Sequence, residues 1–305
     1  MSELKSLIAQ ELAQPVDSRI AAFAASIAAK YGEAARAVLF YGSCLRTTEL
    51  DGQMLDFYLI VSSYEAAYGK SWLAHANKRL PPNVFPAEHD GLVAKVAVLS
   101  ERDFHKLNRI TASAVSVWAR FAQPSRLVWQ ADDAAQETVA ASIKGASITL
   151  FDMTLPMMEI DQKHTISDLW KRGFELTYGA ELRAERKERS DSVVDSDPER
   201  YARFGIAAMA AIAERDKAQD KKFKIVASRD AVEKRWRQLR RNGKILTLAR
   251  LAKASATYAG GIDYLAWKIN RHAGTDYVIK PWQRKWPILG ALVMLPRLIM
   301  GGAIK

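Results

Sequence analysis

The chain has 305 residues and a formal net charge of +11 at pH 7. Its 49% hydrophobic and 26% charged residues are typical of a globular chain with enough core for one large domain or two ordinary ones. The single cysteine, Cys44, excludes a disulfide framework and a cysteine-based zinc site, which fits a reducing compartment. The N-terminal sequence lacks the basic and apolar regions of a signal peptide, so none is expected.

The first half of the chain mixes helical and strand patterns. Helical spacing predicts helices over residues 18–30 and 64–80. Ser100 with Asp103 three residues later predicts the start of another helix, with Ser100 as its N-cap. The apolar runs that predict buried strands are residues 37–41, 55–61, 92–99 and 127–129. We therefore predict an α/β domain around a small mixed sheet in residues 1–130.

From residue 131 onward the pattern is mostly helical. The predicted helices cover residues 132–150, 166–189, 198–217, 232–241, 245–258 and 262–271. Pro198 stands at the first position of its helix, where proline is tolerated. Gly260 and Gly261 interrupt the pattern between the last two helices. We predict a helical and increasingly basic domain over residues 131–280.

The last segment, residues 281–305, differs in character. Residues 287–304 are nearly all apolar, with basic residues and two tryptophans at the flanks. The segment contains Pro296 and Arg297 and is shorter than the roughly 20 apolar residues that a spanning helix needs. We predict an amphipathic tail that associates with a membrane surface. A C-terminal helix packed on the protein's own core is the alternative.

The positive charge belongs to the C-terminal quarter of the chain. Residues 231–305 carry a net charge of +12, whereas residues 1–230 carry −1. Such a region attracts phosphate groups, either of nucleic acid or of an anionic membrane. Because nucleic-acid binding gives no purpose to the apolar tail, the membrane is the favoured partner.

A glycine-serine turn followed by a lone acid is the motif in the chain that most clearly indicates a chemical function. The first apolar run ends in Tyr41-Gly42-Ser43, and the next run carries Asp56, thirteen residues after Ser43. Gly42 lets the backbone approach a phosphate, to which the N–H groups of the turn and the Ser43 hydroxyl can donate. Asp56 can hold Mg²⁺. The arrangement is typical of the triphosphate site of nucleotidyltransferase-fold enzymes; an ordinary hairpin with a solvated acid is the alternative.

Further short segments follow in the order and spacing of one enzyme family. They are residues 41–43, 54–57, 72–77, 95–100, 118–121 with Pro124, and 182–190 with 198–201. On these segments the chain resembles the mitochondrial-type CDP-diacylglycerol synthases, which are phosphatidate cytidylyltransferases also known as mitochondrial translocator assembly and maintenance proteins. The resemblance covers residues 38–201; beyond them the likeness is one of basic, helical character.

The resemblance implies transfer of CMP from CTP to phosphatidic acid, giving CDP-diacylglycerol and pyrophosphate with Mg²⁺ as cofactor. It implies a nucleotidyltransferase fold for the first domain and the catalytic residues Ser43, Asp56 and Lys95, with Asp56 as metal ligand. The implied nucleotide-binding residues are Tyr41, Gly42, Ser43, Lys95 and Arg120. The implied lipid-phosphate-binding residues are Arg183, Arg186 and Lys187. An anionic membrane surface is the further partner, and no nucleic acid is expected.

Several of these residues also have a structural interpretation. Lys95 lies inside an apolar run, where its ammonium needs a partner or an exit at the sheet edge. The basic residues between 183 and 187 have helical spacing and could form one side of a solvated helix. His75 and Asn77 could pack or face solvent as well as contact a nucleotide or a lipid headgroup.

The chain departs from the family pattern near two predicted contacts. Ala119 replaces a glycine before Arg120, and Gln123 replaces a basic residue before Pro124. Tyr58 stands where many nucleotidyltransferases have a second carboxylate. Further metal ligands must then lie elsewhere, and the acids that could supply them are Asp51, Glu88, Asp90 and Asp103.

Two other functions fit part of the sequence. An RNA or other nucleotidyltransferase with a basic nucleic-acid-binding domain would explain the turn, the acid and the charge. A membrane-surface adaptor without catalysis would explain Tyr58. For the favoured function we expect a peripheral protein on the cytoplasmic face of a bacterial inner membrane, or on the matrix face in mitochondria.

Overall fold

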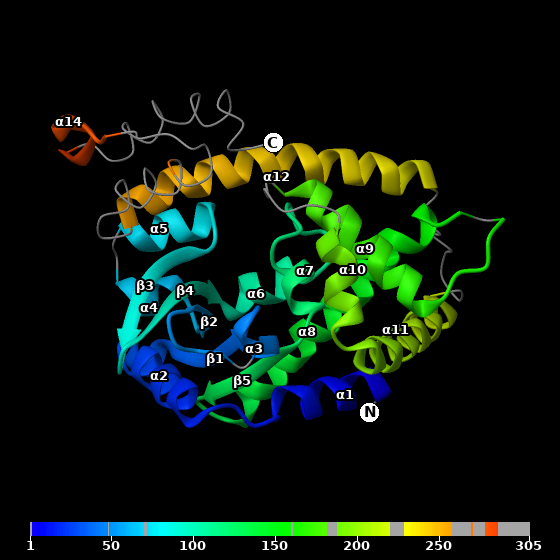
Figure 1. Cartoon of the computed structure of the whole chain (residues 1–305), viewed down its shortest axis with the longest axis horizontal. Helices are drawn as coiled ribbons and strands as arrows, with labels where there is room; N and C mark the ends of the chain where they lie inside the picture. The colour runs from blue at the N-terminus through cyan, green and yellow to red at the C-terminus, as the bar shows by residue number, and fades with distance from the viewer. Residues whose placement is uncertain are drawn as a thin grey trace.

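A computed structural model describes residues 2–47, 49–69, 72–159, 161–181, 188–219, 229–257, 270 and 278–285. A mixed sheet lies at one end of the molecule, and a group of helices lies beside it (Figure 1). One long helix, α12, crosses over both parts (Figure 1). The predicted combination of a small mixed sheet and a mostly helical second half is confirmed for these residues.

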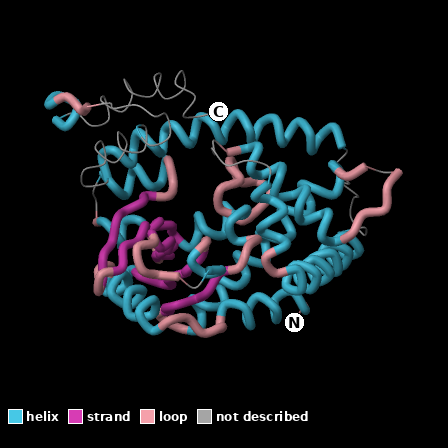
Figure 2. Tube along the Cα trace, viewed as in Figure 1, coloured by secondary structure: helices cyan, strands magenta, loops and turns pink. Residues whose placement is uncertain are grey.

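The five-stranded sheet has the order β3-β4-β2-β1-β5. Its strands are β1 (Ala35–Tyr41), β2 (Met54–Val61), β3 (Asn83–His89), β4 (Leu92–Ser100) and β5 (Ser125–Gln130). Strands β2 and β4 are parallel, and the other neighbours are antiparallel. Figure 2 shows the strands grouped together with helices around them. Both faces of the central strands are therefore covered, which explains why β2 is an almost continuous apolar run.

The four predicted strands are confirmed, and β3 is an additional strand that the sequence pattern does not predict. This strand contains Pro86 and Glu88, which are depleted in most strands. It lies at the edge of the sheet and pairs only with β4. An edge strand tolerates proline because one of its sides makes no ladder hydrogen bonds.

The helices surround the sheet and form the second half of the chain. They are α1 (Glu3–Leu12), α2 (Ser18–Ala29), α3 (Cys44–Thr47), α4 (Tyr64–Tyr68), α5 (Trp72–Arg79), α6 (Glu101–Leu107), α7 (Trp118–Phe121), α8 (Asp133–Thr154), α9 (Ile166–Ala180), α10 (Glu188–Asp195), α11 (Pro198–Gln219), α12 (Arg229–Thr257) and α14 (Pro281–Lys285), with 3₁₀ turns η1 (Gly32–Ala34) and η2 (Leu155–Met157). The predicted N-cap is confirmed, since the Ser100 side chain accepts a hydrogen bond from the Asp103 N–H.

Four predicted helices have the wrong extent. The helix predicted over 64–80 is two helices, because Gly69 adopts a φ of +66° and ends α4. The helix predicted over 166–189 ends at Ala180, because Glu181 has an extended backbone. The two helices predicted over 232–241 and 245–258 are one continuous helix, α12.

Gly243 lies inside α12, where this helix crosses the end of α9. A Cβ atom at this position would lie 2.0 Å from the carbonyl oxygen of Ala180, so only glycine lets α12 cross the end of α9 this closely. Nearby, the buried indole of Trp236 donates a hydrogen bond of 2.7 Å to the Met153 carbonyl. Tertiary packing therefore outweighs the low helix propensity of glycine here.

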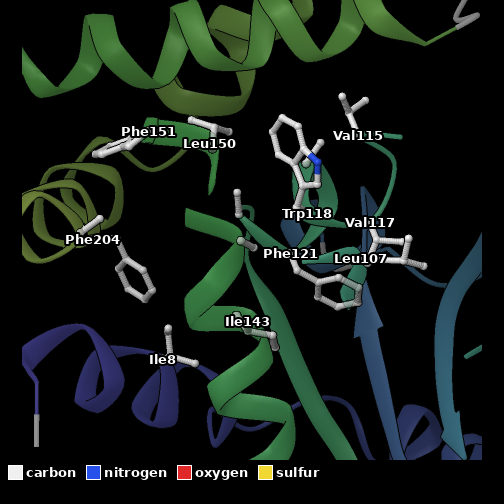
Figure 3. Packing of buried hydrophobic residues seen from close by; sticks show 14 of the residues in the cluster. Ile8, Leu107, Val115, Val117, Trp118, Phe121, Ile143, Leu150, Phe151 and Phe204 are labelled. Carbon is white, nitrogen blue, oxygen red and sulfur yellow. The ribbon is translucent and has the colours of Figure 1, made fainter. Parts of the chain in front are cut away.

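Two hydrophobic clusters cover the two faces of the sheet. The smaller one lies between the sheet and α2 and includes Phe23 and Phe57. The larger one joins the other face to the helical half of the chain, with Tyr58 and Trp170 in the same cluster. Figure 3 shows part of it, with the labelled side chains Ile8, Leu107, Val115, Val117, Trp118, Phe121, Ile143, Leu150, Phe151 and Phe204. The sheet and the second half of the chain thus share one core.

Helix α1, which the sequence analysis did not predict, is held by a buried ion pair. Glu11 accepts hydrogen bonds of 2.6 and 3.1 Å from Arg200 of α11. Both side chains are only 8% exposed. Arg200 also donates to the carbonyl of Ala122, directly after α7. The N-terminal helix is therefore tied to the helical half of the molecule.

Most of the predicted tail lies outside the described residues. Only residues 281–285 of the tail are described, and they form α14. The helix predicted over 262–271 also lies outside them, apart from residue 270. None of the helices in the described ranges has the length and apolar character to cross a membrane.

Candidate active site

Three predicted site residues form one row across the sheet. Tyr41 at the end of β1 pairs with Asp56 near the start of β2, and Asp56 pairs with Lys95 on β4. Directly paired residues point to the same face of a sheet. That face is the one covered by the helical half, because Tyr58, two residues after Asp56, belongs to the larger core. We call Tyr41, Asp56 and Lys95 the polar row.

The turn after β1 lies against the carboxylate of this row. Gly42 has a φ of +100°, a backbone conformation that other residues adopt only with strain. A Cβ atom there would lie 3.1 Å from Oδ2 of Asp56. Ser43 follows and is exposed. The fold therefore brings the two parts of the predicted triphosphate motif, the glycine turn and the acid, side by side.

Tyr58, two residues after Asp56 on the same strand, places an aromatic ring where many nucleotidyltransferases have a second acid. Its side chain is 3% exposed, and its ring centroid lies 5.2 Å from that of Tyr41 and 5.1 Å from that of Phe121. Burial raises the pKa of the Tyr58 phenol, so the group is neutral at physiological pH. A carboxylate at this position would be desolvated and would need a cation or metal as partner.

Arg120 of α7, a predicted nucleotide-binding residue, lies beside the polar row. Its Nη1 donates to the Ser116 carbonyl and lies 3.8 Å from Oε1 of Glu181. Burial alone lowers the pKa of the guanidinium. Groups nearby outweigh burial and raise the pKa overall; they are Tyr58, Glu181, Tyr41 and Asp56. Arg120 is therefore a permanent cation near the acid of the row.

Helix α12 adds two basic side chains that were not among the predicted site residues, Arg250 and Lys253. Arg250 donates to the Pro81 carbonyl at 3.0 Å and to the Ser116 hydroxyl at 3.2 Å. Lys253 donates to the Pro82 carbonyl at 2.8 Å. Burial, with a contribution from Arg250, lowers the pKa of Lys253 to about 7. Their spacing of three residues was a signal that both lie on one face of a helix.

The remaining residues singled out in the sequence are not found at the polar row: they have structural roles, face solvent or lie outside the described residues. Asn77 is buried and its amide donates to the Val98 carbonyl at 3.0 Å, so it has a packing role, whereas His75 is exposed. Gln123 donates to the Ala119 carbonyl at 2.9 Å and closes α7. Arg183, Arg186 and Lys187 lie outside the described residues.

Three of the four acids predicted as possible further metal ligands make other contacts. Asp51 pairs with Arg19 at 3.0 Å, and Asp103 accepts a hydrogen bond of 2.7 Å from Tyr64. Asp90 lies 3.5 Å from His89 in the turn after β3, and Glu88 lies on the edge strand β3 itself. In the described ranges no three His, Cys, Asp or Glu residues form a group that could hold a metal.

The donor set at Asp56 still fits Mg²⁺ bound together with a substrate. Mg²⁺ is commonly held by one or two carboxylates, with substrate phosphates and waters completing its octahedral shell. The site offers one partly exposed carboxylate, and the absent side chain of Gly42 leaves room beside its Oδ2 atom. This donor set suits a metal that arrives with a triphosphate rather than a permanently caged ion.

Comparisons with known proteins assign no family. No protein-family model matches the chain, and no curated protein matches it. Among solved structures, the crystal structure of a nucleotidyltransferase-like protein from Exiguobacterium sibiricum is similar at 11% identity, with a TM-score of 0.28. The match covers 93% of this chain and 92% of the other. At this TM-score the likeness supports no conclusion about fold or chemistry.

Proposed function

We propose that the protein is an Mg²⁺-dependent nucleotidyltransferase with a nucleotidyltransferase-type sheet. The observation that carries this proposal is the Gly42 turn, whose missing Cβ faces Oδ2 of Asp56 at 3.1 Å in a row with Lys95. A backbone turn, an acid and a lysine together can receive a metal-bound triphosphate. The family resemblance of the sequence supports a finer proposal: a phosphatidate cytidylyltransferase that makes CDP-diacylglycerol.

In this reaction a phosphate oxygen of phosphatidic acid attacks the α-phosphorus of CTP in line. The new P–O bond forms while the bond from the α-phosphorus to the bridging oxygen breaks, and pyrophosphate leaves with the electron pair. The acceptor phosphate is already ionised near pH 7, so it needs no strong general base. Catalysis then consists of positioning and of electrostatic stabilisation.

Each residue of the site has a proposed role in that transfer. The N–H groups around Gly42 and the Ser43 hydroxyl would hold the β- and γ-phosphates. Lys95 and Arg120 would offset the charge that develops on the leaving group. Asp56 would hold Mg²⁺, which when bound neutralises part of the triphosphate charge.

The lipid side of the proposal rests on the sequence. Arg183, Arg186 and Lys187 would receive the lipid phosphate, and residues 281–305 would bind an anionic membrane surface. Each Lys or Arg near such a surface contributes about 1 kcal/mol of attraction. The enzyme would then act as a peripheral protein on the cytoplasmic face of a bacterial inner membrane, or on the mitochondrial matrix face.

The proposal is tested by following CMP transfer from labelled CTP. Purified protein with Mg²⁺ is incubated with vesicles containing phosphatidic acid, with RNA, or with neither. We expect labelled CDP-diacylglycerol only with phosphatidic acid and only with Mg²⁺. Label transferred to RNA would replace the lipid function by an RNA nucleotidyltransferase, and no transfer to either acceptor would refute both enzymatic proposals.

Gly42→Ala should weaken CTP binding at least tenfold and lower kcat. The new Cβ strains the backbone at a φ of +100° and presses on Oδ2 of Asp56. Gly91→Ala is the matched control, because Gly91 also has positive φ, +75°, but nothing lies within 4 Å of its added Cβ. Calorimetric titration with CTP measures both. Equal CTP affinity in the two variants would show that the Gly42 turn does not bind the nucleotide.

A further inference from the structure

Two arginines from distant parts of the chain meet at one serine. Arg120 of α7 donates from Nη1 to the Ser116 carbonyl. Arg250 of α12 donates from Nη1 to the Ser116 hydroxyl at 3.2 Å and from Nε to the Pro81 carbonyl at 3.0 Å. Uncharged oxygens therefore hold both guanidiniums in place, while Glu181, and for Arg120 also Asp56, offset part of their positive charge.

Both arginines interact with the carboxylate of Glu181. Oε1 of Glu181 lies 3.8 Å from Nη1 of Arg120, and its charge also acts on Arg250. Burial, together with the positive charge of Arg120, lowers the pKa of Arg250. Two partly buried cations that repel each other are unfavourable by themselves and become favourable when an anion joins them.

Both arginines also have N–H groups that make no hydrogen bond to the described residues. An arginine carries five N–H donors arranged to bind carboxylate or phosphate in a bidentate way. Toward the residues that the structure describes, Nη2 of Arg250 and both Nε and Nη2 of Arg120 donate no hydrogen bond. Lysine would offer a point charge here, whereas two guanidiniums offer a planar, directional site for phosphate oxygens.

The arginine pair lies next to the polar row. The buried Tyr58 phenol is close enough to Arg120, Arg250 and Asp56 for all three to influence its pKa. A phosphate bound by the pair would therefore lie near a triphosphate bound at the Gly42 turn. The reaction proposed above brings together two substrates that both carry phosphate.

We propose that Arg120 and Arg250 form a second phosphate subsite, assembled by α7 and α12, which binds a phosphate group of one of the two substrates. This inference rests on the proposed function for the identity of the ligand. The phosphate belongs either to the acceptor monoester or to CTP, and the two sources are separated by experiment. Helix α12 is then part of the substrate site as well as a structural element.

The test compares Arg250→Gln with Arg235→Gln in the full chain. Arg235 lies on the same helix and donates to the carbonyls of Ile110 and Ala112, at 3.1 and 2.6 Å. Both variants lose a guanidinium held by two hydrogen bonds to uncharged oxygens of other segments, so both should show a similar fall in Tm. Only Arg250→Gln should lose phosphate affinity.

Three probes are titrated by calorimetry: inorganic phosphate, CTP, and a short-chain, water-soluble phosphatidic acid. We expect Arg250→Gln to bind inorganic phosphate at least tenfold more weakly than wild type, and Arg235→Gln to bind it equally well. A matching loss for phosphatidic acid alone assigns the subsite to the acceptor, and a loss for CTP alone assigns it to the triphosphate. Arg250→Lys, which keeps the charge, should show an intermediate loss and replaces the glutamine variant if that one does not fold.

The inference and the proposed function fail in different ways. Absence of CMP transfer by the wild-type protein would refute the enzyme but not the subsite, which inorganic phosphate reports directly. Equal phosphate affinity in wild type and in the Arg250 variants would overturn the subsite, even in an active enzyme. Failure of the wild-type protein to bind phosphate would overturn it as well.

Discussion

Asp56→Asn should abolish CMP transfer and leave the fold intact. Asparagine has nearly the same volume, and the pairing of β2 with β1 and β4 uses backbone groups only. The substitution removes the charge that would hold Mg²⁺ beside Gly42, which should cost several kcal/mol of transition-state stabilisation. Turnover with CTP and phosphatidic acid vesicles measures the effect, and circular dichroism with thermal unfolding checks the fold.

Asp51→Asn is the control for this experiment. Asp51 is an exposed acid that pairs with Arg19, and it lies outside the polar row. Its variant should keep turnover within about twofold, because exposed ion pairs contribute little. If Asp56→Asn kept more than about a tenth of wild-type turnover, the barrier would have changed by less than about 1.4 kcal/mol and the metal role would be wrong.

Gly243→Ala should destabilise the protein by more than about 2 kcal/mol, although the change removes a glycine from a helix. Helix propensity alone would favour alanine by about 1 kcal/mol. The added methyl group, however, would lie 2.0 Å from the Ala180 carbonyl oxygen, and a backbone atom cannot rotate aside. Helix α12 must then move away from α9, which disturbs the packing of Trp236.

Gly179→Ala, on the neighbouring helix α9, should change stability in the opposite direction. Gly179 lies in α9, and nothing is found within 4 Å of an added Cβ. We expect this variant to be more stable than wild type by about 0.5–1 kcal/mol. Denaturant titration of both variants measures the two effects. A Gly243→Ala protein as stable as wild type would show that the helices do not cross this closely in solution.

The sheet was largely predictable from the sequence, because buried strands are short apolar runs between turn residues. β3 was not, since its Pro86 and Glu88 are tolerated only at a sheet edge, which a local pattern does not reveal. The extent of α12 was not predictable either. Its Gly243 breaks the local pattern, and only the crossing with α9 explains it.

In the candidate site, too, local features were predictable from the sequence and tertiary contacts were not. The glycine turn and Asp56 are close in sequence, so their spacing was enough to predict that they meet. Glu181 and Arg250 come from segments far along the chain and reach Arg120 through helix packing. The sequence indicated a basic helix around Arg250, but not which of its cations points inward.

The ion pair between Glu11 and Arg200 has a consequence for protein synthesis. The two residues are 189 positions apart. At about 5–20 residues per second, the ribosome needs roughly 10–40 seconds to make the second after the first. During that time α1 has left the exit tunnel without the partner that buries its carboxylate. The strands from β1 to β5 are complete well before then, so the sheet can form before the buried ion pair does.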